Sequence, residues 1–174
     1  VDRDGVCDVL VLEGGWDEPE LVWVLSGRTG SVIRKDVGEP RTRLLDPHAR
    51  CSDLARIGDV DGDGTLDYAY DLGGWKGGGA IVVRSGRTGA RVWAYPERWE
   101  DGSSRMSIAP LGDVDGDRVA DFAIGMPDVS TSAKSAGRVV VLTGRSRATL
   151  FTIEGRVEEG HFGHVCALTD LDGD

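Results

Sequence analysis

Two nine-residue segments carry four aspartates each at matching positions, and each could bind a metal ion. DVDGDGTLD begins at Asp59 and DVDGDRVAD begins at Asp113, with aspartates at positions 1, 3, 5 and 9 of each. A main-chain carbonyl at position 7 would complete an all-oxygen ligand set, which suits Ca²⁺ better than Mg²⁺. The predicted ligands are Asp59, Asp61, Asp63, Thr65 and Asp67 in the first loop and Asp113, Asp115, Asp117, Val119 and Asp121 in the second.

A bound ion would explain why these carboxylates are held together. Two carboxylates about 5 Å apart repel each other by on the order of 3 kcal/mol at an effective dielectric constant of about 20. The alternative is a solvated acidic turn without an ion. An EF-hand does not fit, because its loop needs an acid at position 12 and helices on both sides. Position 12 is Tyr70 or Ile124 here, and the flanking runs are typical of strands.

Two partial copies of the loop lie near the ends of the sequence. The first copy, VDRDGVCD, contributes the predicted ligands Asp2, Asp4, Val6 and Asp8, and the last, DLDGD, contributes Asp170, Asp172 and Asp174. We therefore expect Ca²⁺ at two full sites and at two partial ones. Arg118 stands where the first full loop has Gly64. A positive φ would strain a non-glycine residue at that position, so we expect weaker or altered binding in the second full loop.

Short apolar runs lie around the loops and must position them. One run follows each loop, a second precedes an SGRTG-like segment, and a third follows that segment. The runs are Val9 to Leu12, Tyr68 to Leu72, Phe122 to Met126, Leu21 to Leu25, Ala80 to Val83, Val139 to Leu142, Val32 to Ile33, Val92 to Tyr95 and Leu150 to Ile153. With the segment that leads into each loop, this predicts four strands per repeat of about 57 residues, and the SGRTG segment is predicted to be a hairpin turn.

Repeated four-stranded units predict an all-β fold made of β-propeller blades of four antiparallel strands. We expect strands two to four of a partial blade in residues 1–38, blades in 49–100 and 104–155, and in 161–174 the first strand of another blade with a truncated calcium loop. About three blades are too few to close a ring. We therefore expect a fragment of a larger propeller, or a partial propeller that self-associates through open blade edges.

Composition excludes several other classes of protein. The net charge of -10 argues against a nucleic-acid partner, because phosphate backbones are bound by clustered Lys and Arg. No apolar run approaches the roughly 20 residues of a membrane helix, so no membrane insertion is expected. The sequence shows no GxSxG, HExxH or SxxK motif, and we expect no enzymatic activity from it. The three cysteines (Cys7, Cys51 and Cys166) are interpreted as small buried hydrophobic residues, with a disulfide left open.

The repeats resemble FG-GAP repeats, the blades of integrin α-subunit propellers and of many bacterial secreted or surface proteins. Phe162-Gly163 matches the FG element, Gly125-Met126-Pro127 matches the GAP element, and the aspartate loops match the family's calcium loop between the first and second strands. Two features depart from the family pattern: Cys51 stands where the FG element would have phenylalanine, and the first two units have Gly-Gly-Trp where Gly-Ala-Pro is expected. The use of SGRTG with DxDGDG loops looks closer to the bacterial proteins. The resemblance implies a calcium-stabilised module that is secreted, at the cell surface or periplasmic.

Propeller topology would place the ligand-binding loops at the end of each blade opposite the calcium loops. The residues expected on that face are Trp16, Trp75, Lys76, Trp99 and Asp128. Exposed tryptophans beside polar groups suit a sugar ring or a protein partner, although Trp16 and Trp75 could instead fill gaps between blades. We expect an extracellular interaction or adhesion module with a protein or glycan ligand. The alternatives are a lectin-like, carbohydrate-binding propeller and the accessory propeller of a secreted enzyme such as a polysaccharide lyase.

Overall fold

The computed structural model describes residues 4–13, 21–38, 53–72, 79–95 and 105–168, and within these ranges it contains strands and no helix. The strands form three antiparallel sheets, which we call A, B and C. Sheet A contains β1 (Val9–Glu13), β2 (Leu21–Leu25) and β3 (Val32–Val37). Sheet B contains β4 (Leu54–Arg56), β5 (Tyr68–Leu72), β6 (Ala80–Arg84) and β7 (Arg91–Tyr95). Sheet C contains β8 (Ser107–Gly112), β9 (Asp121–Met126), β10 (Arg138–Leu142) and β11 (Thr149–Glu154).

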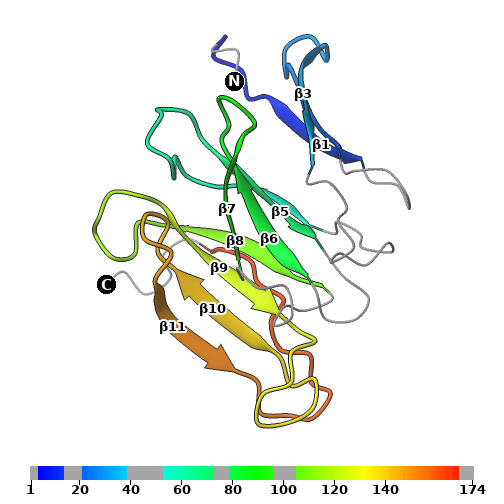
Figure 1. Cartoon of the computed structure of the whole chain (residues 1–174), viewed down its shortest axis with the longest axis vertical. Helices are drawn as coiled ribbons and strands as arrows, with labels where there is room; N and C mark the ends of the chain where they lie inside the picture. Colours follow the sequence, from blue (N-terminus) through cyan, green and yellow to red (C-terminus); the bar gives the residue numbers. More distant parts are fainter. Residues whose placement is uncertain (1–3, 14–20, 39–52, 73–78, 96–104, 169–174) are drawn as a thin grey trace.

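Each sheet is an up-and-down meander, and the three sheets lie one beside the next with sheet B in the middle (Figure 1). The predicted all-β fold of antiparallel, blade-like sheets is therefore confirmed, and the sheets do not close into a ring. Every residue of β5 and β6 is buried, as expected for strands covered on both faces. The division of the chain into blades at the stated residue limits stays a prediction.

The predicted SGRTG turns connect the last two strands of all three sheets. The turns are Ser26–Gly30, Ser85–Gly89 and Thr143–Arg147, and in each the fifth residue donates its N–H to the carbonyl of the first. That fifth residue has a positive φ in every copy, including Arg147 at 62°. A register shift follows at the end of β2, β6 and β10, so the same bulge recurs in each sheet. The repeat in the sequence is thus a repeat of backbone geometry.

Sheets B and C meet through an apolar core. The rings of Trp93 on β7 and Phe122 on β9 stack with their centroids 5.2 Å apart. Both belong to a buried cluster that also contains Ile57, Ile81 and Ile124. A hydrogen bond adds to this contact, because the backbone N–H of Ile108 donates to the Asp53 carboxylate (2.8 Å).

Sheets A and B meet at the corresponding positions through a polar network. The hydroxyl of Tyr68 donates to Asp36 (2.8 Å), which also accepts from Arg34 Nε (2.6 Å). Arg34 Nη1 also donates to the carbonyls of Gly86 (3.1 Å) and Arg87 (2.6 Å) in the turn of sheet B. Burial, together with the hydrogen bond to Asp36, raises the pKa of the Tyr68 phenol, so it stays a neutral donor. This network replaces the aromatic stack of the other sheet boundary.

After β11 the chain turns back along the outer face of sheet C (Figure 1). Phe162 forms an isolated parallel bridge with Gly137, and the N–H of Val165 donates to Ser107 Oγ (3.1 Å). Val165 packs against a small buried cluster of sheet C that contains Ala109 and Val139. Residues 161–168 form no strand, and the further blade expected in residues 161–174 stays a prediction.

Candidate metal centre

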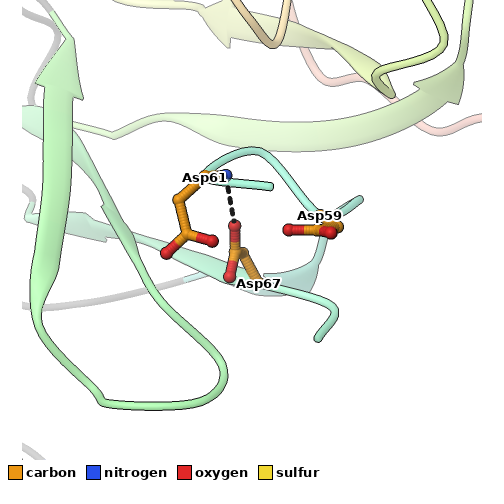
Figure 2. Close-up of side chains that lie close together, drawn as sticks. All are labelled: Asp59, Asp61 and Asp67. Atoms are coloured by element: carbon orange, nitrogen blue, oxygen red, sulfur yellow. Dashed lines mark hydrogen bonds between the residues drawn. The ribbon is translucent and has the colours of Figure 1, made fainter. Parts of the chain in front are cut away.

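The first complete aspartate loop connects β4 and β5 and gathers three carboxylates. Asp59, Asp61 and Asp67 each offer one oxygen, and these oxygens lie within 4.8 Å of one another (Figure 2). Asp113, Asp115 and Asp117 form a second such group between β8 and β9. The structure thus brings together six of the predicted ligands in two groups, one per complete loop.

Asp67 is the buried centre of its loop, and its side chain has no exposed surface. One carboxylate oxygen accepts from the N–H groups of Val60 (2.8 Å) and Asp61 (3.2 Å), and the second of these bonds is drawn in Figure 2. The other oxygen accepts from the N–H of Gly86 (2.9 Å), in the turn between β6 and β7. Burial raises the pKa of Asp67, and these backbone donors only partly offset the effect. A nearby cation would favour the ionised form.

The second loop repeats this arrangement around Asp121. Its carboxylate accepts from the N–H groups of Val114 (2.7 Å), Asp115 (3.3 Å) and Gly144 (2.9 Å). Asp121 is also buried. Position 9 of the loop is therefore a brace that ties the loop to the neighbouring turn in both sheets.

The remaining carboxylates fold the loop around one point. Asp59 accepts from the N–H groups of Asp63 (3.0 Å) and Gly64 (2.8 Å), and Asp63 accepts from that of Thr65 (2.8 Å). A carboxylate oxygen has two lone pairs, so accepting one N–H leaves capacity for a cation. The donor set consists of oxygens alone and carries several negative charges, which fits a hard cation such as Ca²⁺. Asp59, Asp61, Asp63 and Asp67 would hold the ion, with the Thr65 carbonyl as a further donor.

An arginine from the SGRTG turn covers position 5 of each loop. Arg28 Nε bonds Asp4 (2.8 Å) and Arg145 Nε pairs with Asp117 (3.1 Å). Arg87 donates to the main-chain carbonyl of Asp63, and the Nε of Arg87 lies 3.6 Å from the side-chain carboxylate of Asp63. The sequence predicted only a turn for this segment, and this contact was not predicted.

The pKa of Asp63 is lowered. Burial alone would raise this pKa, but hydrogen bonds from Ser85 and Thr65 and the positive charge of Arg87 outweigh the effect of burial. Asp63 is therefore held ionised beside a buried carboxylate, Asp67, whose pKa is raised.

Arg118 has the positive φ that its position in the loop requires. Its φ is 70°, close to the 83° of Gly64 in the first full loop. The backbone pattern is otherwise retained, because the N–H of Arg118 donates to Asp113 (2.8 Å) as that of Gly64 does to Asp59. The positive φ at Arg118 is confirmed, and its effect on calcium binding stays a prediction.

Replacing Arg118 with glycine is expected to tighten calcium binding in the second full loop. Relief of about 1 kcal/mol of backbone strain corresponds to roughly five-fold in affinity. Calorimetric titration in an Asp61→Ala background, which weakens the first loop, would measure it. Arg118→Ala is the matched control, since it removes the charge but keeps the strained φ. Equal affinities of the two variants would show that charge, and not strain, limits the site.

The partial loops are described only in part. Asp4 accepts from the N–H of Val6 (2.8 Å), and Asp8 accepts from that of Gly27 (3.4 Å), as their counterparts do in the complete loops. Asp2, Asp170, Asp172 and Asp174 lie outside the described residues. Calcium at the two ends therefore stays a prediction.

Four of the five predicted ligand-binding residues lie outside the described residues, namely Trp16, Trp75, Lys76 and Trp99. Asp128 follows β9, where it pairs with Arg105 Nη2 (3.5 Å) and His161 Nδ1 (3.3 Å). These contacts connect the turn after β9 to the returning carboxyl-terminal segment.

The cysteines differ from their interpretation as buried hydrophobic residues. Cys7 and Cys166 are free and exposed. Cys7 follows the tight turn of a loop at the surface, and Cys166 lies on the irregular segment after Phe162. Neither position is enclosed by a sheet. Cys51 lies outside the described residues.

Comparison with known proteins gives partial similarity to integrin alpha chains. No family model matches the sequence. The chain is 30% identical to integrin alpha-V of Gallus gallus over 76 residues, which cover 44% of this chain and 7% of that protein. It is 44% identical to integrin alpha-PS2 of Drosophila melanogaster over 63 residues, 36% of this chain and 4% of that protein. The chain thus spans less than a tenth of the length of these curated relatives.

The part of the chain that the structure describes contains no helix that is long and apolar enough to cross a membrane.

Proposed function

We propose that this chain is part of a calcium-stabilised, FG-GAP-like β-propeller that serves as an extracellular interaction or adhesion module. The observation that carries the proposal is the recurrence of one acidic loop, with the same bonds around Asp67 and Asp121, at the start of successive blade-like sheets. The similarity to integrin alpha chains supports the same type of module. We propose a secreted, cell-surface or periplasmic location, in a protein of bacterial type.

The ion would act as a structural staple. Each loop leaves the first strand of a sheet and enters the second, so a cation held by Asp59, Asp61, Asp63 and Asp67 would fix the approach of β4 to β5. It would also relieve the repulsion between these carboxylates, which grows as they are drawn together. Millimolar Ca²⁺ outside cells is sufficient to fill sites of modest affinity.

A binding role fits this chain better than a catalytic one. The acidic clusters that the structure gathers belong to the loops, where backbone N–H groups already orient their oxygens. We propose that the ligand is a protein or a glycan and that it binds at the end of the sheets opposite the aspartate loops. A lectin-like role would depend on tryptophans that lie outside the described residues, and an accessory role would depend on the enzyme to which the chain belongs.

Calcium is expected to raise the thermal unfolding midpoint relative to a chelator. Calcium at about 100 times its Kd adds about 2.7 kcal/mol per site, which corresponds to roughly 5 to 10 °C for a chain of this size. Scanning calorimetry in calcium, in magnesium and in EDTA would measure the shift. Magnesium serves as the control, since its smaller octahedral shell suits this flexible loop less well. Equal midpoints in calcium and in EDTA would refute the stapling role.

A further inference from the structure

The turn of sheet B, Ser85–Gly89, contacts the first complete aspartate loop on one side. The N–H of Gly86 donates to Asp67 (2.9 Å), and the hydroxyl of the first turn residue donates to Asp63 (3.1 Å). The side chain of Arg87 donates to the main-chain carbonyl of Asp63. Asp63 and Asp67 are two of the four carboxylates that would hold the ion in this loop. Their positions therefore depend on the position of the turn.

Sheet A holds the same turn from the other side, through Arg34 on β3. Arg34 Nη1 donates to the main-chain carbonyls of Gly86 (3.1 Å) and Arg87 (2.6 Å). Gly86 and Arg87 are thus bonded both to the aspartate loop and to sheet A. The guanidinium is itself oriented, because its Nε donates to the buried carboxylate of Asp36 (2.6 Å). A planar guanidinium can donate in both directions at once, which an ammonium group cannot do with the same fixed geometry.

The boundary between sheets B and C provides a comparison within the same chain. The turn of sheet C contacts its own aspartate loop in the same way, through Gly144 and Arg145. The residue at the repeat position of Arg34 is Trp93. Its indole N–H is buried and has no hydrogen-bond partner among the described residues. Arg34 therefore gives the first complete loop a connection to the neighbouring sheet that Trp93 does not give to the second.

We propose that Arg34 is a positioning residue for calcium in the first complete loop, and that calcium held there strengthens the contact between sheets A and B. The inference rests on the proposed function, since it requires calcium in that loop. Coupling between two binding events is reciprocal. If sheet A raises the calcium affinity of the loop by holding the turn, calcium stabilises the docking of sheet A by the same factor. The first loop would then join two sheets, whereas the second would act within its own sheet.

Replacing Arg34 with methionine is expected to weaken calcium binding in the first complete loop and not in the second. The substitution keeps an unbranched side chain on β3 but removes the donors to the turn. Loss of a hydrogen bond from a charged donor corresponds to about ten-fold in affinity. Calcium titration followed by amide NMR would measure both loops in one sample. The N–H of Gly64 reports the first loop and that of Arg118 the second, because each donates to the first aspartate of its own loop.

Tyr68→Phe is the matched control at the same sheet boundary. It removes the hydrogen bond from Tyr68 to Asp36, which joins sheets A and B without involving the turn. The calcium affinity of the first loop should therefore stay unchanged in this variant. Equal losses in Tyr68→Phe and Arg34→Met would show that any loosening of the boundary has this effect, and would overturn the positioning role.

A second measurement leaves Arg34 in place and reads the coupling in the other direction. Calcium is expected to slow amide hydrogen exchange in β2 and β3, because it stabilises the docking of sheet A. Asp61→Ala, which weakens the first loop, should reduce this slowing more than Asp115→Ala, the matched change in the second loop. Both aspartates are exposed, so neither substitution disturbs a buried contact. Equal slowing in the two variants would refute the coupling.

The titration also separates this inference from the proposed function. A calcium response at both amides that Arg34→Met leaves unchanged would overturn the role of Arg34 and leave the calcium staple intact. An unmodified chain without a calcium response at either amide would refute the staple, and the inference with it.

Discussion

Replacing Asp67 with alanine is expected to destabilise the fold even in the presence of a chelator. The substitution leaves the N–H groups of Val60, Asp61 and Gly86 without their acceptor, and of these Gly86 is buried whereas Asp61 is exposed. A buried donor without a partner costs about 1 to 3 kcal/mol, so we expect a loss on the order of 3 kcal/mol. Chemical denaturation in EDTA would measure it. The calcium-dependent stabilisation should disappear in the same variant.

Asp61→Ala is the control that separates the metal from the brace. Asp61 is exposed, and its carboxylate accepts from the N–H of Asp63 (3.1 Å) within the loop. Its loss should weaken the response to calcium while changing the stability in EDTA by less than about 1 kcal/mol. If Asp67→Ala were as stable as Asp61→Ala in EDTA, the brace described for position 9 would be wrong.

The repeat made the strands predictable. A strand follows each loop, because the closing aspartate is succeeded by runs such as Tyr68–Leu72, which are rich in apolar and aromatic residues and bounded by glycine. The turn segments were equally clear, since glycine at the fifth position supplies the positive φ seen at Gly30 and Gly89. The limits of β5 and β2 match those expected, because the local pattern and the packing favour the same residues.

The contact between turn and loop was not predicted, although the sequence contains a signal for it. A turn of this type needs a positive φ at its fifth residue, where the third copy has Arg147. The backbone of the turn makes no such demand on its second and third residues. These are nevertheless glycine and arginine in all three copies: Gly27-Arg28, Gly86-Arg87 and Gly144-Arg145. Residues that recur where the turn itself does not need them indicate a contact elsewhere. Their partner could not be identified, because it lies about 20 residues away across two strands.

The nature of the sheet boundaries could not be read from the sequence either. Equivalent positions hold Arg34 and Tyr68 at one boundary and Trp93 and Phe122 at the other. Arginine and tyrosine on a strand are usually assigned to a solvated face, because burial of a charged group is costly without a partner. Here Asp36 supplies that partner from the same strand as Arg34. The hydrogen bond from Tyr68 to Asp36, in contrast, joins two sheets, and the local pattern does not specify how sheets stack.

Replacing Gly86 with alanine is expected to destabilise the fold and to weaken its response to calcium. A Cβ at this position would lie 1.8 Å from the carbonyl oxygen of Leu66, and this main-chain atom cannot move aside without disrupting the loop. The corresponding distances are 1.8 Å at Gly27 and 2.1 Å at Gly144, so each sheet has the same close approach. Forced overpacking typically costs about 1 to 3 kcal/mol and sometimes more. Here the displaced turn would also lose the bond from Gly86 N–H to Asp67.

The predicted outcome is a fall of roughly 5 to 10 °C in the unfolding midpoint, together with a smaller difference between calcium and EDTA. Gly62→Ala provides the control, because Gly62 has a φ of 77° but open space around its Cβ position. Its cost should be limited to the strain of a left-handed residue, about 1 to 2 kcal/mol, with the calcium response retained. Scanning calorimetry of both variants in calcium and in EDTA tests the difference. If Gly86→Ala kept the full calcium response, the turn would be a connection between strands and not a support for the metal loop.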